Sequence, residues 1–308
     1  MKKVFCIVAT YNGLKWVEKC FGSLSDSDYP ASIIAVDDVS DDGTPEAIKK
    51  SFPKVNIIKQ PVNSGTRAAN NAGVKIALQN DADYIFIMNN DVWIEKDTIS
   101  NLIEVAEKNS DYGIISPMHL NGSNTGLDYL FSTYIVPQKC PDLYSDIYMN
   151  KLKDIYPIYN VNAAAWFVRK EVFTEIGLFD DLFFMYGEDD NFVDRVKHYG
   201  FRVGVTPTTN IFHDREHRAP NVNSIKTDYK KQIRRMKVIA LNPNSTTSEK
   251  LFLLFRKSMS DFIMNLKLLK IQAGFINVTI LIYGIFYSIR YKNRHRKLKK
   301  RMQTSSDA

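Results

Sequence analysis

Two hydrophobic periods alternate along the first 120 residues. Short apolar runs typical of buried strands occur at residues 2–9, 32–38, 55–60, 84–91 and 112–118. Apolar positions three or four residues apart predict helices between them, at residues 14–24, from 44, at 66–79 and after 97. Continuous apolar strands separated by helices indicate a parallel sheet covered on both faces. The pattern therefore predicts an α/β fold with a mostly parallel central sheet.

The pattern loosens between residues 120 and 160, which are rich in Tyr, Asp and Pro and predict irregular structure. It then becomes regular again, with a strand predicted at 201–207 and helices at 169–176, 189–199, 228–241 and 248–270. Residues 271–289 are mostly apolar and carry no charge. The chain is thus expected to end in a C-terminal helical segment.

Polar and acidic residues follow three of the predicted strands. They are Thr10-Tyr11-Asn12, Asp37-Asp38 and Asn89-Asn90-Asp91. Ligands of such sheets bind outside the carboxyl ends of the strands, so these groups are expected to form one site. Carboxylates there suit a divalent cation, and the cation suits a phosphate-bearing substrate. The glycine patterns of dinucleotide-binding folds and P-loops do not occur, which excludes those two classes of site.

The composition is that of an ordinary soluble protein. Of 308 residues, 44% are hydrophobic and 24% are charged, which excludes a disordered chain, a collagen-like fibre and a polytopic membrane protein. Cys6, Cys20 and Cys140 show no close CxxC spacing, so a reducing, cytoplasmic compartment is expected. The first apolar run is shorter than the roughly 7–15 residues of a secretory signal core, so no signal peptide is expected.

The basic charge is concentrated near the C-terminus. The formal net charge is +7, and residues 290–301 alone contain eight Lys or Arg and no acid. Basic tails bind nucleic acid or anionic membranes. A solvated terminal helix is the alternative interpretation.

Five motifs follow one another along the chain: VATYNG (8–13), VDDVSDDGT (36–44), NSGTRAANNAG (63–73), MNNDV (88–92) and GLFDDLFFMYGEDDNFVDR (177–195). Together they resemble family-2 glycosyltransferases with the GT-A fold, especially bacterial rhamnosyltransferase-like enzymes of polysaccharide assembly. The resemblance implies a GT-A catalytic domain over residues 1–225. Its nucleotide-sugar half would span about 1–118, its acceptor half 119–225, and the C-terminal helices 226–308.

The resemblance also implies an activity. It is that of an inverting, metal-dependent enzyme that moves a sugar from a UDP- or dTDP-sugar to a hydroxyl of a polysaccharide or lipid-linked glycan. Processive relatives carry a QxxRW motif, but Gln232–Met236 has Met in place of Trp, so a non-processive enzyme is expected. A non-catalytic nucleotide-sugar-binding partner of another transferase is the alternative, supported by Asn89 and Asn191 where the family has acids.

The resemblance places the donor against the ends of the first, second and fourth predicted strands and against the loop before residue 66. The donor-binding residues would be Thr10, Tyr11, Asn12, Asp37, Asp38, Asn63, Gly65, Arg67, Asn89 and Asn90. A carboxylate beside a pyrimidine can accept the ring N3–H, which favours uracil or thymine over cytosine. Arg67 would reach the diphosphate or ribose. The alternative for Asp37 and Asp38 is turn formation and helix capping.

The remaining implied roles concern metal, catalysis and acceptor. Asp91 and His213 would hold Mg²⁺ or Mn²⁺. Asp189 would act as the base that takes the acceptor proton, with Glu188 orienting the acceptor; helix-start capping is the alternative. Trp166 and Phe167 would bind the acceptor sugar through their faces, unless they are core aromatics.

Residues 271–289 have about the length needed to span a bilayer. A span would export the basic tail, against the positive-inside tendency. Peripheral attachment to the anionic inner face of the cell membrane is therefore expected, with no nucleic-acid partner. A bilayer span, and packing of this segment in the monomer or a homo-oligomer, are the alternatives.

Overall fold

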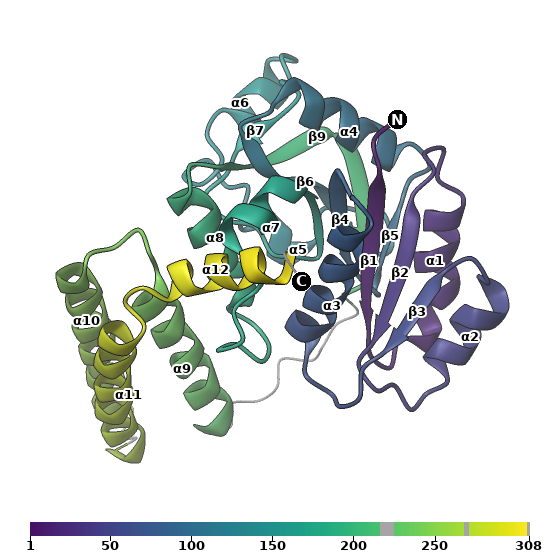
Figure 1. The fold of residues 1–308 in the computed structure, drawn as a ribbon. Helices are drawn as coiled ribbons and strands as arrows, with labels where there is room; N and C mark the ends of the chain where they lie inside the picture. Colours follow the sequence, from purple (N-terminus) through teal and green to yellow (C-terminus); the bar gives the residue numbers. More distant parts are fainter. Residues whose placement is uncertain (216–224, 268–270, 307–308) are drawn as a thin grey trace.

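The computed structural model describes residues 1–215, 225–267 and 271–306. Within these residues nine strands form one curled sheet in the order β3-β2-β1-β4-β8-β6-β9-β5, and β7 pairs with β9 (Figure 1). Their bounds are β1 Val4–Thr10, β2 Ser32–Asp37, β3 Asn56–Lys59, β4 Tyr84–Asn89, β5 Val92–Ile94, β6 Tyr112–Asn121, β7 Tyr156–Pro157, β8 Ala165–Arg169 and β9 Arg202–His213. The predicted α/β fold is confirmed.

The sheet is parallel on one side and mixed on the other. β1 pairs in parallel with β2 and β4, and β2 pairs in parallel with β3. β8 runs antiparallel between β4 and β6, while β9 returns parallel to β6. The short strands β5, β7 and β8 had no separate strand signal, because each is only two to five residues long. The mixed side is therefore the part that the hydrophobic pattern missed.

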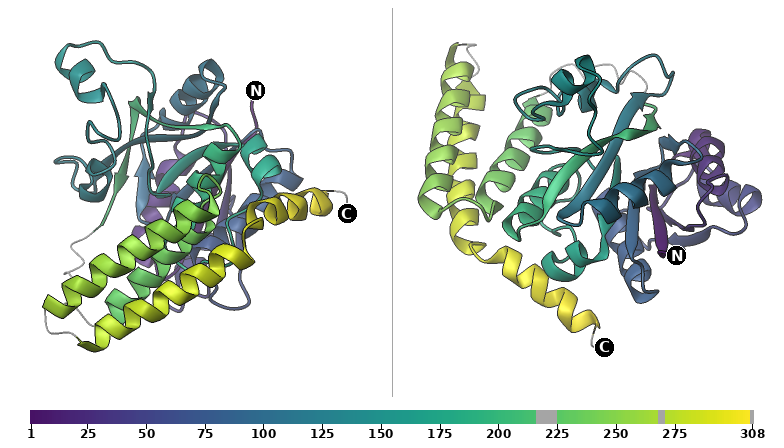
Figure 2. Two further views of the ribbon diagram at one scale, coloured as in Figure 1. Left: turned by 90° about the vertical axis from the view of Figure 1, so that its left-hand side faces the viewer. Right: turned by 90° about the horizontal axis from the view of Figure 1, so that it is seen from above.

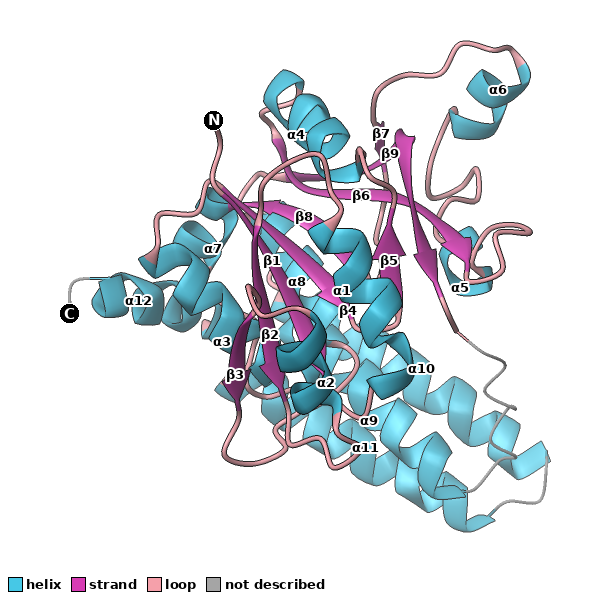
Figure 3. Cartoon of the chain, turned by 90° about the vertical axis from the view of Figure 1, so that its right-hand side faces the viewer, coloured by secondary structure: helices cyan, strands magenta, loops and turns pink. Residues whose placement is uncertain are grey.

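Helices cover both faces of the sheet, as predicted (Figure 3). Cys6 and Val8 of β1 point to a core shared with α1 (Val17–Ser25), α2 (Thr44–Ser51) and α4 (Thr98–Lys108). Ile7 points to the opposite core, shared with α3 (Thr66–Gln79), α7 (Lys170–Ile176) and α8 (Glu188–His198). Burial of each such aliphatic side chain contributes about 1.5–3 kcal/mol to folding. This alternation fixes which face of the sheet each side chain enters, while the parallel direction of β1, β2 and β4 sets which edge carries the polar loops.

Residues 122–155 form a loop region that packs only lightly on the sheet. It contains the short helices α5 (Tyr129–Ser132) and α6 (Leu143–Tyr148). Phe131 and Leu143 anchor these helices and are fully buried, whereas Tyr129 and Tyr148 are 85% and 89% exposed. A shorter 3-10 helix, η1 (Leu14–Trp16), follows β1.

Three C-terminal helices form a separate small core beside the α/β unit. They are α9 (Ile225–Leu241), α10 (Thr247–Lys267) and α11 (Ile271–Arg290), and they meet through Met236, Ala240, Leu254 and Ile280. Figure 2 shows α10 and α11 as a long hairpin. The predicted helices at 228–241 and 248–270 are present, although residues 268–270 lie outside the described residues. Over the described ranges, no helix combines the length and hydropathy needed to cross a membrane.

The basic tail is an ordered helix that returns to the α/β unit. α12 (Arg294–Ser306) lies along α7 (Figure 1). Leu298 of α12 is buried, and its carbonyl approaches Gly177 so closely that a Cβ at residue 177 would lie 2.6 Å from it. Arg294 and Arg301 form ion pairs with Asp180 and Asp181. Two of the charges assigned to an anionic surface are thus already paired within the chain.

Candidate active site

The parallel register brings the expected polar strand ends together. Thr10 lies opposite Asp37, and Ala9 lies opposite Asn89. Thr10 Oγ1 donates a hydrogen bond to Asp37 Oδ1 at 3.2 Å, and both residues are buried. The predicted convergence of the first, second and fourth strand ends is therefore present in the structure.

The two acids after β2 hold loop backbone. Asp37 accepts a hydrogen bond from the Ser40 N–H at 3.1 Å. The two oxygens of Asp38 accept from the N–H groups of Ser64 and Gly65, at 2.8 and 2.7 Å. The contact of Asp37 with Ser40 matches the turn-forming alternative, whereas Asp38 binds the distant loop at Ser64 and Gly65. The Asp38 contacts fix the path of the loop that leads into α3.

The loop after β1 is tied to its neighbours by two adjacent residues. Asn12 adopts a φ of 48°, and its side-chain oxygen accepts from the Asp41 N–H at 3.0 Å. Asn90 packs directly on Gly13, where any Cβ would overlap its amide. Tyr11, by contrast, is 52% exposed and can contact a ligand.

The loop before α3 contacts the segment that precedes the acidic pair. Gly65 has a φ of 80°, and a Cβ there would overlap the carbonyl of Phe184. Asn63 is exposed on the same loop. The positive charge of Arg67 acts on Glu188, which lies at the start of α8. Loops from the two halves of the sheet therefore meet here.

Several buried polar atoms have no hydrogen-bond partner within the described part of the chain. They include Arg67 Nε, Asn70 Oδ1, Asn162 Oδ1 and Glu188 Oε2. Asn70 lies one helical turn after Arg67, and Asn70 and Asn162 are 4% and 6% exposed. Buried polar groups are normally satisfied, so such a set indicates a polar ligand. The helical spacing of Asn70 from Arg67 is a sequence signal that could have identified it.

Strand β5 brings the two expected metal ligands together. It pairs antiparallel with β9, with Val92 opposite His213. Asp91 Oδ1 therefore lies 3.3 Å from His213 Nε2 in a buried setting, and it has no hydrogen bond among the described residues. Those residues contain no group of three or more acidic, His or Cys side chains arranged for a metal. Asp91 and His213 can thus supply two ligands to a metal ion.

Two residues behind His213 were not expected from the sequence. Asp128 Oδ2 lies 3.7 Å from His213 Nδ1, and Arg215 Nε donates to the same Nδ1 at 3.2 Å. Asp128 is 2% exposed, and it also caps α5 by accepting from the Phe131 N–H at 2.7 Å. An acidic residue that caps a short helix, such as Asp128, can be recognised from the local sequence. The local sequence does not indicate that His213 lies beside Asp128.

The expected acidic pair opens α8 after Gly187, whose φ is 91°. Burial, followed by the charge of Asp189, raises the pKa of Glu188 to about 7. Burial and the charge of Asp190 raise the pKa of Asp189 to about 6. Carboxyl groups with pKa values near neutrality can accept and return a proton at physiological pH.

Tyr134 is a partly buried tyrosine of the irregular segment. Burial raises its pKa to about 12. The negative charges of Asp189, Asp190 and Asp128 raise it further, whereas the positive charge of Arg215 lowers it. No sequence pattern singles out this tyrosine in the irregular segment 120–160.

Trp166 and Phe167 lie in the core. They are 0% and 1% exposed, because β8 alternates and sends one ring into each face of the sheet. Trp166 stacks on Phe179 with ring centroids 6.1 Å apart. A ring must expose a face to stack on a sugar, so the structure corrects the expectation that these two residues bind the acceptor directly.

The family model described as "Glycosyl transferase family 2" matches residues 5–177. This range covers more than half of the chain. The chain belongs to glycosyl transferase family 2. It is a glycosyltransferase, and the alternative of a non-catalytic nucleotide-sugar-binding chain has no support from the family or from the relatives described below.

 

Two curated relatives are similar to this chain over most or about half of its length. The chain is 24% identical over 246 residues to the N-acetylglucosaminyl-diphospho-decaprenol L-rhamnosyltransferase of Mycobacterium tuberculosis, covering 70% of this chain and 78% of that protein. It is also 24% identical over 172 residues to the low-salt glycan biosynthesis hexosyltransferase Agl10 of Haloferax volcanii, covering 53% of each. These relatives are named for transfer to a lipid-linked acceptor and for glycan synthesis.

Solved structures confirm the GT-A fold. Staphylococcus aureus TarS residues 1–349 in complex with UDP-GlcNAc superposes with a TM-score of 0.60 at 16% identity, over 98% of this chain and 92% of that chain. GalNAc-T7 with UDP, GalNAc and Mn²⁺ superposes with a TM-score of 0.58 at 14% identity, over 78% of this chain and 48% of that chain. At these identities the likeness concerns the fold alone.

Proposed function

We propose that this glycosyltransferase moves one sugar, or a few, from a UDP- or dTDP-sugar to a hydroxyl of a polysaccharide or lipid-linked glycan, with inversion at the anomeric carbon. The observation that carries the proposal is the contact of Gly65, on the loop before α3, with the carbonyl of Phe184, which lies four residues before Glu188. The loop beside the strand ends therefore meets the segment that opens the acidic helix α8. A donor held at the strand ends would then present its anomeric carbon to the acids.

Glu188 and Asp189 interact with different neighbouring charges. The positive charge of Arg67, on helix α3 of the donor side, lowers the pKa of Glu188. Asp189 acts on Tyr134 from the loop side of the site. We therefore assign Asp189 as the base and Glu188 as the group that orients the reactants.

The transfer balances with one proton and one leaving group. The acceptor O–H bond breaks as its proton moves to a carboxylate oxygen of Asp189. The acceptor oxygen forms a bond to the anomeric carbon, and the bond from that carbon to the diphosphate oxygen breaks with its electrons on the nucleotide. General-base assistance of this kind contributes about 10²–10⁴-fold to the rate.

The Asp91–His213 pair fits a Mg²⁺ or Mn²⁺ ion that is shared with the substrate. Mg²⁺ is commonly bound through one or two carboxylates plus substrate phosphates, and Asp91 Oδ1 is buried without a hydrogen bond among the described residues. When bound, the ion would neutralise charge on the departing diphosphate. Asp91 and His213 would be the residues of this chain that hold it.

We also propose that the enzyme works at the cytoplasmic face of a membrane. The hairpin of α10 and α11 exposes a row of large apolar side chains: Phe252, Phe255, Met259, Ile263, Val278, Ile282, Ile285, Phe286 and Ile289. Exposed cations lie on the same hairpin, and the Arg290 guanidinium lies 5.4 Å from the Phe286 ring centre. An apolar face flanked by cations complements an anionic lipid surface.

A donor screen tests the enzymatic proposal. The full chain is incubated with a panel of UDP- and dTDP-sugars, with Mg²⁺ or Mn²⁺, and free UDP or dTDP is measured. We expect release from one donor class, loss of release in EDTA, and loss in Asp91→Ala. Full activity in EDTA would contradict the metal assignment, and no release from any donor would contradict the donor assignment.

A further inference from the structure

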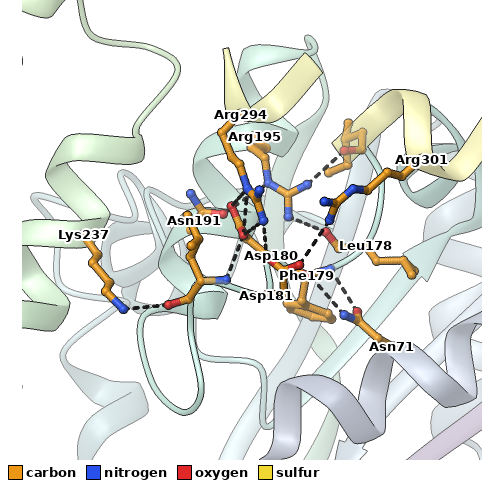
Figure 4. A network of polar contacts seen from close by, with 12 residues as sticks. Asn71, Leu178, Phe179, Asp180, Asp181, Asn191, Arg195, Lys237, Arg294 and Arg301 are labelled. Carbon is orange, nitrogen blue, oxygen red and sulfur yellow. Dashed lines mark hydrogen bonds and ion pairs between the residues drawn. The ribbon is translucent and has the colours of Figure 1, made fainter. Parts of the chain in front are cut away.

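The segment from Leu178 to Gly187 connects α7 to the acidic pair, and other elements hold it on several sides (Figure 4). The Asn71 side chain of α3 pairs with both the N–H and the carbonyl of Phe179, at 3.0 Å each. Lys237 of α9 donates to the carbonyl of Leu182 at 2.7 Å. The segment is therefore fixed by helices from distant parts of the sequence.

Asp180 is the charged centre of this segment. Its side chain is fully buried. Arg294 of α12 donates to it from Nη2 at 2.8 Å and from Nε at 3.1 and 3.2 Å, a forked arrangement. Asp180 Oδ1 also accepts from the Leu182 N–H at 3.0 Å, which bends the backbone toward the acids. A carboxylate buried this deeply requires a paired cation.

The neighbouring cation, Arg195, donates its hydrogen bonds to groups other than the Asp180 carboxylate. Its guanidinium donates to the carbonyls of Ile176 and Leu178, at 2.9 and 2.7 Å, and to Asn191 Oδ1 at 3.3 Å. Its charge interacts favourably with Asp180, but within the described part of the chain it forms no ion pair or hydrogen bond with that carboxylate.

 The charged partner in direct contact with the Asp180 carboxylate is thus Arg294 of α12.

The same segment reaches both parts of the reaction site. The Phe183 ring packs at Gly187, immediately before the acidic pair. The Phe184 carbonyl packs on Gly65 of the donor loop. A shift of Asp180 would therefore move the start of α8 and its contact with the donor loop together.

We propose that Arg294 is a positioning residue, which acts through Asp180 to fix the segment 178–187 and so to place Glu188 and Asp189 for the reaction. The inference rests on the proposed function for those two acids. It gives α12 a role beyond its charge, because the last helix of the chain completes the support of the reaction site.

The test uses the full chain and four variants. Arg294→Gln removes the cation, and Arg294→Lys keeps a charge without the fork. Lys297→Gln is the matched control, since Lys297 is an exposed cation on the same helix. Asp180→Asn combined with Arg294→Gln removes both charges and leaves no unpaired carboxylate, so it remains usable if Arg294→Gln fails to fold.

The kinetic readout is the donor turnover identified in the screen, together with UDP affinity. Since small misplacements of reacting groups cost up to about 10²-fold, we expect kcat to fall at least about ten-fold in Arg294→Gln. UDP affinity should change far less. Arg294→Lys should recover part of kcat, Lys297→Gln should match the wild type, and the double variant should remain impaired. Wild-type kcat in a folded Arg294→Gln or double variant would overturn the proposal.

Hydrogen exchange provides a readout that does not depend on activity. In Arg294→Gln, or in the double variant, amides of residues 178–191 should exchange faster, while those of β1 to β3 keep their wild-type rates. Unchanged exchange over 178–191 would overturn the positioning role. If the wild type turns over no donor, the proposed function fails, and this exchange measurement still decides whether Arg294 orders the segment.

Discussion

Asp128 Oδ2 lies 3.7 Å from His213 Nδ1, on the side of the imidazole ring opposite Asp91. A histidine that binds a metal through Nε2 usually donates its Nδ1–H to such an acceptor. Arg215 competes for the same nitrogen, because its Nε donates to Nδ1 at 3.2 Å. If the Asp91–His213 pair holds a cation as proposed, its affinity would depend on Asp128, which would not touch the cation.

The first prediction concerns Asp128. Asp128→Ser keeps a side-chain acceptor that can cap α5 but removes the carboxylate behind His213. Loss of such an outer partner typically weakens metal binding about 10–100-fold, so Mn²⁺ affinity in the presence of UDP should fall by that amount. Titration calorimetry measures it, with the exposed Asp26→Asn as the control. Unchanged Mn²⁺ affinity would show that Asp128 serves α5 alone.

The second prediction concerns the base. Asp189→Asn should lower kcat by about 10²-fold or more, because the acceptor proton then has no carboxylate to receive it. UDP affinity should stay close to that of the wild type. In the wild type the rate should rise with pH through about 6, where Asp189 loses its proton. Near-normal turnover by the Asn variant would remove Asp189 from this role.

The third prediction concerns stability. The pKa of Glu188 is raised to about 7 in the folded protein, so the folded state holds a proton that the unfolded state releases at lower pH. Stability must therefore fall as pH rises from the ordinary Glu pKa to about 7. Glu188→Gln should be more stable than the wild type at pH 8, by about 1–3 kcal/mol, and should show no such gain at pH 4.

Thermal or urea unfolding at the two pH values measures this difference. Glu175→Gln, on the exposed surface of α7, is the matched control and should show no pH-dependent gain. An equal effect of Glu188→Gln at both pH values would contradict the assigned pKa.

The fourth prediction concerns Tyr134. Tyr134→Phe keeps the ring and removes the hydroxyl, whose pKa is raised by the charge of Asp189. We expect this hydroxyl to form a hydrogen bond with the acceptor. Loss of one neutral hydrogen bond costs about 0.5–1.5 kcal/mol, so transfer to an acceptor should slow several-fold, while hydrolysis of the donor in water should not change. Tyr129→Phe, at a highly exposed tyrosine of the same region, should have no effect. Equal loss of transfer and hydrolysis would argue against an acceptor-side role.

The fifth prediction concerns the α10–α11 hairpin. Ile282→Glu and Ile289→Glu place a charge on its apolar face, at side chains that are 63% and 64% exposed. Both should lose sedimentation with vesicles that contain phosphatidylglycerol, since a carboxylate opposes insertion and meets anionic lipid. Tyr148→Glu, at an exposed apolar position far along the chain from the hairpin, should sediment normally. Wild-type binding by both Ile variants would refute the membrane surface.

Local patterns predicted the parts of the site that depend on single elements. The strand ends at Thr10, Asp37 and Asn89 converge because parallel strands share an edge, which the apolar runs already indicate. The β5–β9 pairing, by contrast, joins residues 120 positions apart and rests on a three-residue strand. No local pattern specifies such a pairing, so the surroundings of His213 could not be foreseen.

Burial explains why the acceptor-binding role expected for Trp166 and Phe167 was wrong. The sequence AWFVR can be interpreted as the approach to a helix or as a strand, and only the strand puts Trp166 and Phe167 on opposite faces of the sheet. The contact of Arg294 with Asp180 spans 114 positions. Long-range contacts of this kind depend on how whole helices return to the sheet, which neither composition nor periodicity encodes.

The position of Arg294 also has a consequence for biosynthesis. Ribosomes add about 5–20 residues per second, and the N-terminal part of a chain folds first. The sheet can therefore assemble before α12 is made, but the Asp180 carboxylate receives its forked partner only when α12 has left the ribosome. A nascent chain, or one that stops before residue 294, would carry the donor and metal residues without that support. Synthesis of α12 would then be the step that places the acidic pair.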